Sequence, residues 1–343
     1  MRSLTTEILL SICIPTYNRA HKLRLLLENI EECFDIDSVE VCVSDNKSTD
    51  NTEDVIKEFS KKFINFKYQI NIENKGMAFN WINVTKMATG RYISVVSDED
   101  SFLANYSDKL FPILKENIYS VVFYRVLNNS TNDIWAPSIF DYKKIEHTAE
   151  LDNKIEIFKY LHISGYVFKK NLISFQKVDE LYALFPRNNW CAPYFTYNVI
   201  SNNPSIYFHP DVLYLCSDDT NRGYKEWKNT YSCFNHNYIS ESNNHEGTVF
   251  LLNQKMILYF YSYFFNENLS RQLIKNLSMN LQKSLFMIIH KTDIEDSDLK
   301  DLKNEIVLIN KTYNVNIKVT KNIATKFIYN IYHLLSLLKK KML

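Results

Sequence analysis

The amino-acid sequence predicts an α/β protein with a doubly wound, mostly parallel sheet. In the first hundred residues, short apolar runs typical of buried strands alternate three times with segments whose apolar residues recur at helical spacing. Such alternation favours parallel strands joined by right-handed crossovers. Each strand-like run ends in polar residues, so we expect several polar loops to meet at the carboxyl edge of one sheet, where open α/β sheets bind ligands.

The first apolar run covers residues 8–14 and ends at Pro15, and helical spacing begins at Leu23. The second run, residues 39–44, leads into Asp45 and a polar loop before helical spacing resumes at Val55. The simplest function of that loop is to cap the second helix, for which it offers four side chains: Ser48, Thr49, Asp50 and Thr52.

A third strand is expected at residues 66–70, followed by a loop that contains Asn74, Lys75 and Gly76. A helix is predicted from about Met77 to Ala88, with Gly90 as its carboxyl-terminal cap.

The fourth strand, RYISVVSDED at residues 91–100, ends in three carboxylates. If the chain stays extended, Asp98 and Asp100 project to one side and Glu99 to the other. Hard carboxylate oxygens at a strand end suit Mg²⁺ or Mn²⁺ carrying a diphosphate. An isolated D-x-D is more often a solvated acidic turn, but the three preceding loops favour a binding site here.

Composition excludes several classes of protein. The chain has 343 residues, enough for one large domain or two ordinary ones, and 40 Lys and Arg against 39 Asp and Glu give a net charge of +1. This balance gives no support to nucleic-acid binding. Neither a G-x-G-x-x-G turn nor a G-x-x-x-x-G-K-[ST] loop occurs, which argues against NAD enzymes and P-loop NTPases.

The six cysteines include no C-x-x-C pair, so we expect buried free thiols in a reducing cytoplasm. Pro15 ends the first apolar run before a signal peptide or a membrane span could form, and we expect neither.

Three segments together resemble a known family: LLSICIPTYNRAHKLRLLLENI (9–30), VEVCVSDNKSTDNTEDVI (39–56) and NIENKGMAFNWINVTKMATGRYISVVSDED (71–100). They are similar to the amino-terminal half of family 2 glycosyltransferases, which have the GT-A fold. The resemblance covers residues 8–125, extends more weakly to about residue 170, and is specific for a nucleotide-sugar site.

The resemblance implies roles for individual residues. Asp45 would hold the nucleotide base, Asp98 would face the ribose or a metal ion, and Asp100 would ligate the metal, Mn²⁺ or Mg²⁺. Glu99 stands where the family more often has Asp. The residues expected to bind the nucleotide sugar are Pro15, Thr16, Tyr17, Arg19, Asp45, Asn46, Ser48, Asn74, Lys75, Gly76 and Asp98.

On the acceptor side, the resemblance places Ser164 and Gly165 in a segment that borders the acceptor site. The general base is predicted at Asp179 or Glu180, with Asp218 and Asp219 as the next pair; helix capping or solvation would equally explain these acids. The Q-x-x-R-W signature of processive synthases is missing, which favours transfer of a single sugar.

The expected domains are residues 1–125 for the nucleotide sugar, 126–247 for the acceptor and 248–343 as a helical carboxyl-terminal region. The segment 327–338 has a broad apolar face and precedes Lys339, Lys340 and Lys341. This helix could pack on its own domain or lie on an anionic membrane surface.

The sequence therefore predicts an inverting transferase that moves one sugar from a nucleotide donor, with a UDP-sugar favoured, to a glycan or lipid-linked glycan. Bacterial capsule, lipooligosaccharide or O-antigen synthesis is the expected setting, in the cytoplasm or at the inner face of the plasma membrane. The alternatives are a sugar-nucleotide pyrophosphorylase, whose Gly-rich signature is missing, and a noncatalytic glycan-binding or scaffolding module on the same fold.

Overall fold

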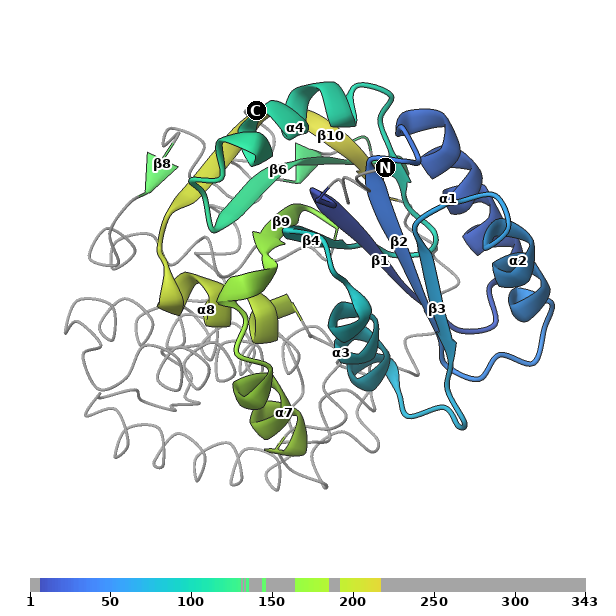
Figure 1. Cartoon of the computed structure of the whole chain (residues 1–343). Helices are drawn as coiled ribbons and strands as arrows, with labels where there is room; N and C mark the ends of the chain where they lie inside the picture. Colours follow the sequence, from blue (N-terminus) through green and yellow to red (C-terminus); the bar gives the residue numbers. More distant parts are fainter. Residues whose placement is uncertain are drawn as a thin grey trace, which may run out of the picture. The chain divides into compact units, whose positions relative to one another are not determined.

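The computed structural model describes residues 7–130, 132, 134–135, 144–145, 164–184 and 192–216, all within one compact unit, Met1–Cys233. This unit has a mixed α/β fold with helices on both faces of a curled sheet (Figure 1). Its strands are β1 (Leu10–Thr16), β2 (Val39–Asp45), β3 (Phe66–Ile70), β4 (Tyr92–Val95), β5 (Ser101–Phe102), β6 (Val121–Asn128), β7 (Ile134–Trp135), β8 (Lys144–Ile145), β9 (Tyr166–Lys169) and β10 (Ile206–Cys216). Its helices are α1 (Ala20–Cys33), α2 (Thr52–Phe59), α3 (Met77–Met87), α4 (Tyr106–Glu116), the short 3-10 helix η1 (Lys170–Leu172), α7 (Phe175–Leu184) and α8 (Ala192–Asn202).

The sheet runs in the order β3-β2-β1-β4-β9-β6-β10-β5. β1 pairs in parallel with β2 and with β4, and β2 pairs in parallel with β3. β9 lies antiparallel between β4 and β6, so β6 and its parallel neighbour β10 run in the same direction as β1 to β4. The predicted mostly parallel sheet is confirmed, with β9 as an antiparallel insertion and the short strands β5, β7 and β8 also antiparallel to their neighbours.

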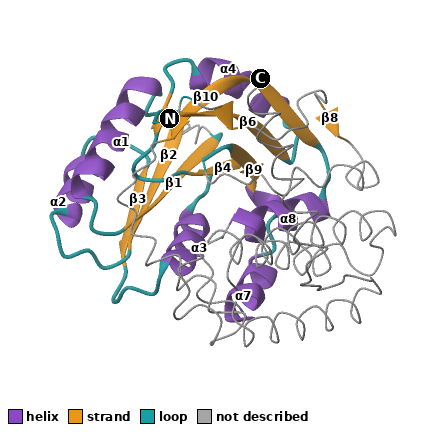
Figure 2. Ribbon diagram, turned by 180° about the vertical axis from the view of Figure 1, so that it is seen from behind, coloured by secondary structure: helices purple, strands orange, loops and turns teal. Residues whose placement is uncertain are grey.

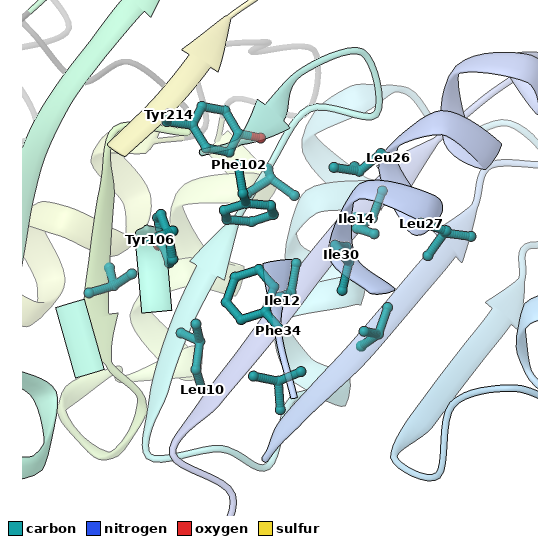
Figure 3. Packing of buried hydrophobic residues seen from close by; sticks show 14 of the residues in the cluster. Leu10, Ile12, Ile14, Leu26, Leu27, Ile30, Phe34, Phe102, Tyr106 and Tyr214 are labelled. Atoms are coloured by element: carbon teal, nitrogen blue, oxygen red, sulfur yellow. The ribbon is translucent and has the colours of Figure 1, made fainter. Parts of the chain in front are cut away.

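Alternating side chains of β1 explain why helices cover both faces. Leu10, Ile12 and Ile14 are fully buried and belong to one apolar cluster with Leu27 and Ile30 of α1 (Figure 3). On the opposite face, the Cys13 thiol lies 3.6 Å from a backbone carbonyl oxygen of α3. Figure 2 shows α1 and α2 on one side of the sheet and α3 on the other.

A cluster of aromatic rings lies where β5 meets β10. The Phe102 ring centroid is 4.9 Å from that of Phe34, 4.7 Å from that of Tyr106 and 4.9 Å from that of Tyr214, all edge to face (Figure 3). β5 also pairs antiparallel with Tyr214 and Leu215 of β10. These contacts fix the chain directly after Asp100.

Most element boundaries lie within two residues of the sequence prediction, but the fourth strand, expected over residues 91–100, covers only Tyr92–Val95. The fourth strand ends at Val95, because the chain turns before the acids: the Asp100 N–H donates to the Ser97 carbonyl at 3.3 Å. The predictions for residues 217–343, including the basic carboxyl-terminal helix and the boundary at 248, lie outside the described residues.

The described cysteines Cys13, Cys33, Cys42 and Cys216 are free thiols, and three of them are buried, as expected. In the part of the chain that the structure describes, no helix is both long enough and apolar enough to cross a membrane.

The amino edge of the sheet is fixed by a buried carboxylate, Glu40, which is 2% exposed. Its oxygens accept hydrogen bonds from Ser11, Thr89 and Lys67, which come from β1, the loop before β4, and β3. The prediction that Gly90 caps α3 is wrong, since Ala88 is the cap residue. Residue 90 must nevertheless be glycine, because a Cβ atom there would lie 2.6 Å from the Ser11 hydroxyl oxygen.

We expect Glu40→Gln to lower the free energy of unfolding by about 2 kcal/mol at pH 7, because the amide keeps only one acceptor oxygen and turns an NH₂ donor and no charge toward donors arranged around a buried carboxylate. Burial alone would raise the pKa of Glu40, but the hydrogen bonds from Lys67, Ser11 and Thr89 outweigh it and lower the pKa from 4.5 to about 2. A depressed pKa stabilises the fold above pH 4.5, and this contribution is lost as the pH falls toward 2. Urea unfolding at several pH values should therefore show the two proteins converging in acid; a constant difference would contradict this account.

Candidate functional site

The order of the strands reverses beside β1, since β2 lies on one side of it and β4 on the other. Such a switch point is where open α/β sheets bind ligands, outside the carboxyl ends of the strands. Here the Thr16 hydroxyl, at the end of β1, donates a 2.7 Å hydrogen bond to Asp98 Oδ2, just after β4. Both residues are buried, so this contact joins the two strand ends at the switch point.

Arg19 completes this contact. Its Nη1 lies 3.0 Å from Asp98 Oδ1 and 2.9 Å from Glu99 Oε2, and Lys22 Nζ lies 3.3 Å from the same Glu99 oxygen. The turn after β4 lets both acids reach Arg19, so they are not held apart by strand alternation as an extended chain would require. Burial raises the pKa of Asp98, and the charge of Arg19 and the Thr16 hydrogen bond oppose that rise.

The first two loops interlock. Asn18 has a positive φ of 52°, its N–H donates to the Ser48 hydroxyl at 2.8 Å, and its side-chain oxygen accepts the Thr49 N–H at 2.7 Å. The Asp50 carboxylate accepts the N–H groups of Ala20 at 3.0 Å and Thr52 at 3.1 Å. One side chain thus satisfies amide groups in the first turns of both α1 and α2, which orients the two loops together.

Asp45 ends β2 and is only 1% exposed. Its carboxylate accepts hydrogen bonds from the N–H, at 3.0 Å, and from the hydroxyl of Ser48. Burial raises the pKa of Asp45, and the Ser48 hydrogen bonds oppose that effect. Asp45 is therefore a fixed acceptor at the same edge as Asp98.

Asn46 connects the third loop to this edge. Its amide nitrogen donates to Asn74 Oδ1 at 2.8 Å and to the Gly76 carbonyl at 3.1 Å, and its amide oxygen accepts the Lys75 N–H at 3.2 Å. Gly76 has a φ of +85°, a conformation that favours glycine, although an added Cβ would meet nothing within 4 Å. The structure thus brings all three predicted loops together.

Sequence analysis missed Asn80, which is 3% exposed on α3. Its amide nitrogen donates to the carbonyl oxygens of Thr16 at 3.2 Å and Ser44 at 2.8 Å, and its oxygen accepts from Asn71 at 3.1 Å. Asn80 therefore ties the ends of β1 and β2 to α3. The available signal was an asparagine within an apolar stretch of the helix, where a polar side chain needs buried partners.

Ser164 and Gly165 also lie near the acids. The Ser164 hydroxyl donates a 2.8 Å hydrogen bond to Asp100 Oδ2, and the Gly165 carbonyl accepts the Tyr124 N–H at 3.1 Å. The chain around Asp100 is therefore in contact with the segment that the resemblance placed on the acceptor side.

The carboxylates of Asp98 and Asp100 are a donor set of the kind that binds a divalent cation shared with a phosphorylated ligand. Among the described residues, no group of three or more His, Cys, Asp and Glu side chains could hold a metal. Mg²⁺, however, commonly takes one or two carboxylates and completes its shell with water and substrate phosphates. Both Asp98 oxygens accept bonds from Thr16 and Arg19, and Asp100 Oδ2 accepts one from Ser164, so direct ligation of a cation by Asp100 stays a prediction.

The structure does not bring Asp179 and Glu180 to this edge. Both are exposed on α7, where Asp179 pairs with Lys86 at 2.7 Å and Glu180 accepts from Gln176 at 3.0 Å. Lys86 lies ten residues after Gly76 along α3, about 15 Å along the helix axis toward the amino edge. The second pair, Asp218 and Asp219, lies outside the described residues, so the general base stays a prediction.

The comparisons with known proteins agree with the arrangement of these loops. The family model described as "Glycosyl transferase family 2" matches residues 11–180, which include every predicted site residue except the second general-base pair, Asp218 and Asp219. Residues 11–180, just under half of the chain, belong to glycosyl transferase family 2.

Among its relatives within this family, a Campylobacter jejuni GalNAc(5)-diNAcBac-PP-undecaprenol beta-1,3-glucosyltransferase is 29% identical over 50% of this chain and 55% of its own length. The abequosyltransferase RfbV of Salmonella typhimurium is 39% identical over 27% of this chain and 29% of its own length. The chain thus spans well under two thirds of these relatives.

Among solved structures of this fold, S. aureus TarS 1-349 in complex with UDP-GlcNAc superposes with a TM-score of 0.54 and 17% identity, over 82% of this chain and 81% of TarS 1-349. At this identity the likeness supports the glycosyltransferase fold.

We expect Asn80→Ala to lower the free energy of unfolding by about 3 kcal/mol, because two buried carbonyl oxygens and two side chains lose a partner. Asn65→Ala is the matched control: Asn65 donates to the Asp37 carbonyl at 3.2 Å in an exposed position, and its loss should cost less than about 0.5 kcal/mol. Equal effects in urea unfolding would show that the Asn80 network does not hold the strand ends.

We expect Asp179→Asn and Glu180→Gln to leave the rate of UDP release from a UDP-sugar within about threefold of wild type, since an exposed pair such as Lys86–Asp179 contributes little. The measurement is donor hydrolysis at saturating donor. A fall of about a hundredfold or more at unchanged KM, as expected for a lost general base, would instead assign that role to the substituted residue.

Proposed function

We propose that this family 2 glycosyltransferase transfers a single sugar, with inversion, from a nucleoside-diphosphate sugar to a glycan acceptor. The observation that carries the proposal is the Thr16–Asp98 contact at the switch point, with Asp45 and Asp100 buried beside it. A UDP-sugar is the favoured donor. Support for UDP comes from TarS, a structural neighbour solved in complex with UDP-GlcNAc and with UDP.

In this proposal the first two loops bind the nucleoside. Asp45 is a fixed acceptor for a base N–H, because Ser48 holds its carboxylate in one orientation. Asp98, oriented by Thr16 and Arg19, is an acceptor for ribose hydroxyls. Arg19 is one third exposed, so its guanidinium also offers positive charge toward a bound diphosphate.

Asp100 would hold Mn²⁺ or Mg²⁺ together with the donor phosphates. The cation would supply charge neutralisation as the diphosphate leaves the anomeric carbon. The protein's contribution is a carboxylate that is only 6% exposed and is held by Ser164, so the site needs little reorganisation during the reaction.

The acceptor is proposed to be a bacterial surface glycan, built on a lipid carrier. The names of two relatives support this: the Campylobacter jejuni enzyme, and a UDP-Glc:alpha-D-GlcNAc-diphosphoundecaprenol beta-1,3-glucosyltransferase of Escherichia coli, WfgD, 28% identical over 40% of this chain and 55% of its own length. A lipid-linked acceptor would also give the basic segment that ends at Lys341 a reason to lie on an anionic membrane.

The test is calorimetric titration with UDP, with and without Mn²⁺. We expect wild type to bind UDP more tightly with Mn²⁺. In Asp100→Asn, the increase in UDP affinity that Mn²⁺ causes should be at least about tenfold smaller, while the variant melts near the wild-type temperature. The control is Asp108→Asn, which removes an exposed acid from α4.

Wild-type protein that binds no nucleoside diphosphate with any base, with or without Mn²⁺, would contradict the proposed function. Binding of GDP or dTDP in place of UDP would change the donor and leave the site in place. Product analysis separates the pyrophosphorylase alternative, which would make a sugar nucleotide where a transferase consumes one.

A further inference from the structure

One side chain outside the nucleotide loops contacts the candidate metal ligand directly. The Ser164 hydroxyl donates to Asp100 Oδ2 at 2.8 Å and accepts the backbone N–H of Ser97 at 3.2 Å. Ser164 is fully buried and Asp100 is 6% exposed. The hydroxyl therefore bridges the two ends of the turn that carries the acids.

The position of Ser164 is set by the sheet. It comes two residues before β9, which is hydrogen-bonded to β4 on one side and to β6 on the other. The next residue, Gly165, accepts a 3.1 Å hydrogen bond from the Tyr124 N–H of β6. The hydroxyl thus belongs to a rigid strand end, 64 residues from its acidic partner.

The backbone on both sides of Asp100 is fixed as well. Before it, the Asp100 N–H closes a turn on Ser97 at 3.3 Å; after it, β5 pairs with β10 and Phe102 enters the aromatic cluster. The rotation of the Asp100 carboxylate is then the main freedom left, and a hydrogen bond from a neutral donor to a buried carboxylate restricts it strongly.

We propose that Ser164 is a positioning residue for Asp100, setting the affinity of the site for a divalent cation without contributing to nucleoside binding. This inference rests on the proposed function, in which Asp100 ligates the cation. It also links the two halves of the site, because the strand end that borders the acceptor side orients the carboxylate on the donor side.

The experiment measures the dissociation constant of UDP by calorimetry at several Mn²⁺ concentrations, in wild type and in Ser164→Ala. Partners that orient a metal ligand typically change metal affinity by about 10- to 100-fold. We expect the Mn²⁺ concentration that gives half of the gain in UDP affinity to rise by about that factor, while UDP affinity without metal stays unchanged. A purely structural role would not separate these two quantities.

Ser120→Ala is the matched control. Ser120 is fully buried and its hydroxyl donates to the Ser205 carbonyl at 2.7 Å, where the two residues directly precede β6 and β10 at the amino edge of the sheet. Its loss should lower the melting temperature as Ser164→Ala does and leave the Mn²⁺ dependence unchanged. If Ser164→Ala does not fold, Ser164→Cys keeps the packing with a weaker donor and should shift the Mn²⁺ dependence in the same direction by a smaller factor.

The outcomes are distinguishable. Wild-type protein that binds UDP without any effect of Mn²⁺ would overturn the metal part of the proposed function and this inference with it. A Mn²⁺ effect in wild type that is unchanged in Ser164→Ala, or in a folded Ser164→Cys, would overturn the role of Ser164 alone. Equal losses with and without metal would assign Ser164 to structure or to nucleoside binding.

Discussion

The parallel pairing of β1 with β2 on one side and β4 on the other is the constraint on which the rest of the structure depends. It places Thr16, Asp45 and Asp98 at one edge, although they are far apart in the sequence. The Thr16–Asp98 hydrogen bond forms because the parallel register pairs Cys13 with Val95, and Thr16 and Asp98 each lie three residues beyond that pair. Without that pairing, the buried acids would have no partners and would strongly favour exposure.

The two edges of the sheet have different tasks. At the amino edge, Glu40 accepts hydrogen bonds from three segments and Gly90 packs against Ser11, so this edge is closed and contributes stability. At the carboxyl edge, Asp45 is held by Ser48, Asp98 by Thr16 and Arg19, and Asp100 by Ser164. The same fold thus concentrates rigidity at one end and polar groups that a ligand can contact at the other.

Much of this could be predicted from the sequence, for physical reasons. The alternation of apolar runs with helically spaced apolar residues was enough to predict the first four strands. Asp45 and Asp98 could then be placed because parallel strands end at a common edge. The hydrogen bonds could not be predicted, since most partners of Asn80 and Ser164 lie 36 to 67 residues away and depend on register. The turn after Val95 and the antiparallel direction of β9 were missed because both follow from tertiary packing.

The central claim is that a nucleoside diphosphate lies across the switch point between β1 and β4. The most direct measurement is a crystal structure of the protein with UDP and Mn²⁺. The account predicts the uracil beside Asp45, the ribose within hydrogen-bond distance of Asp98 and the cation bound by Asp100. Nucleotide density at any other edge of the sheet, or a diphosphate bound without contact to the turn at residues 97–100, would contradict it.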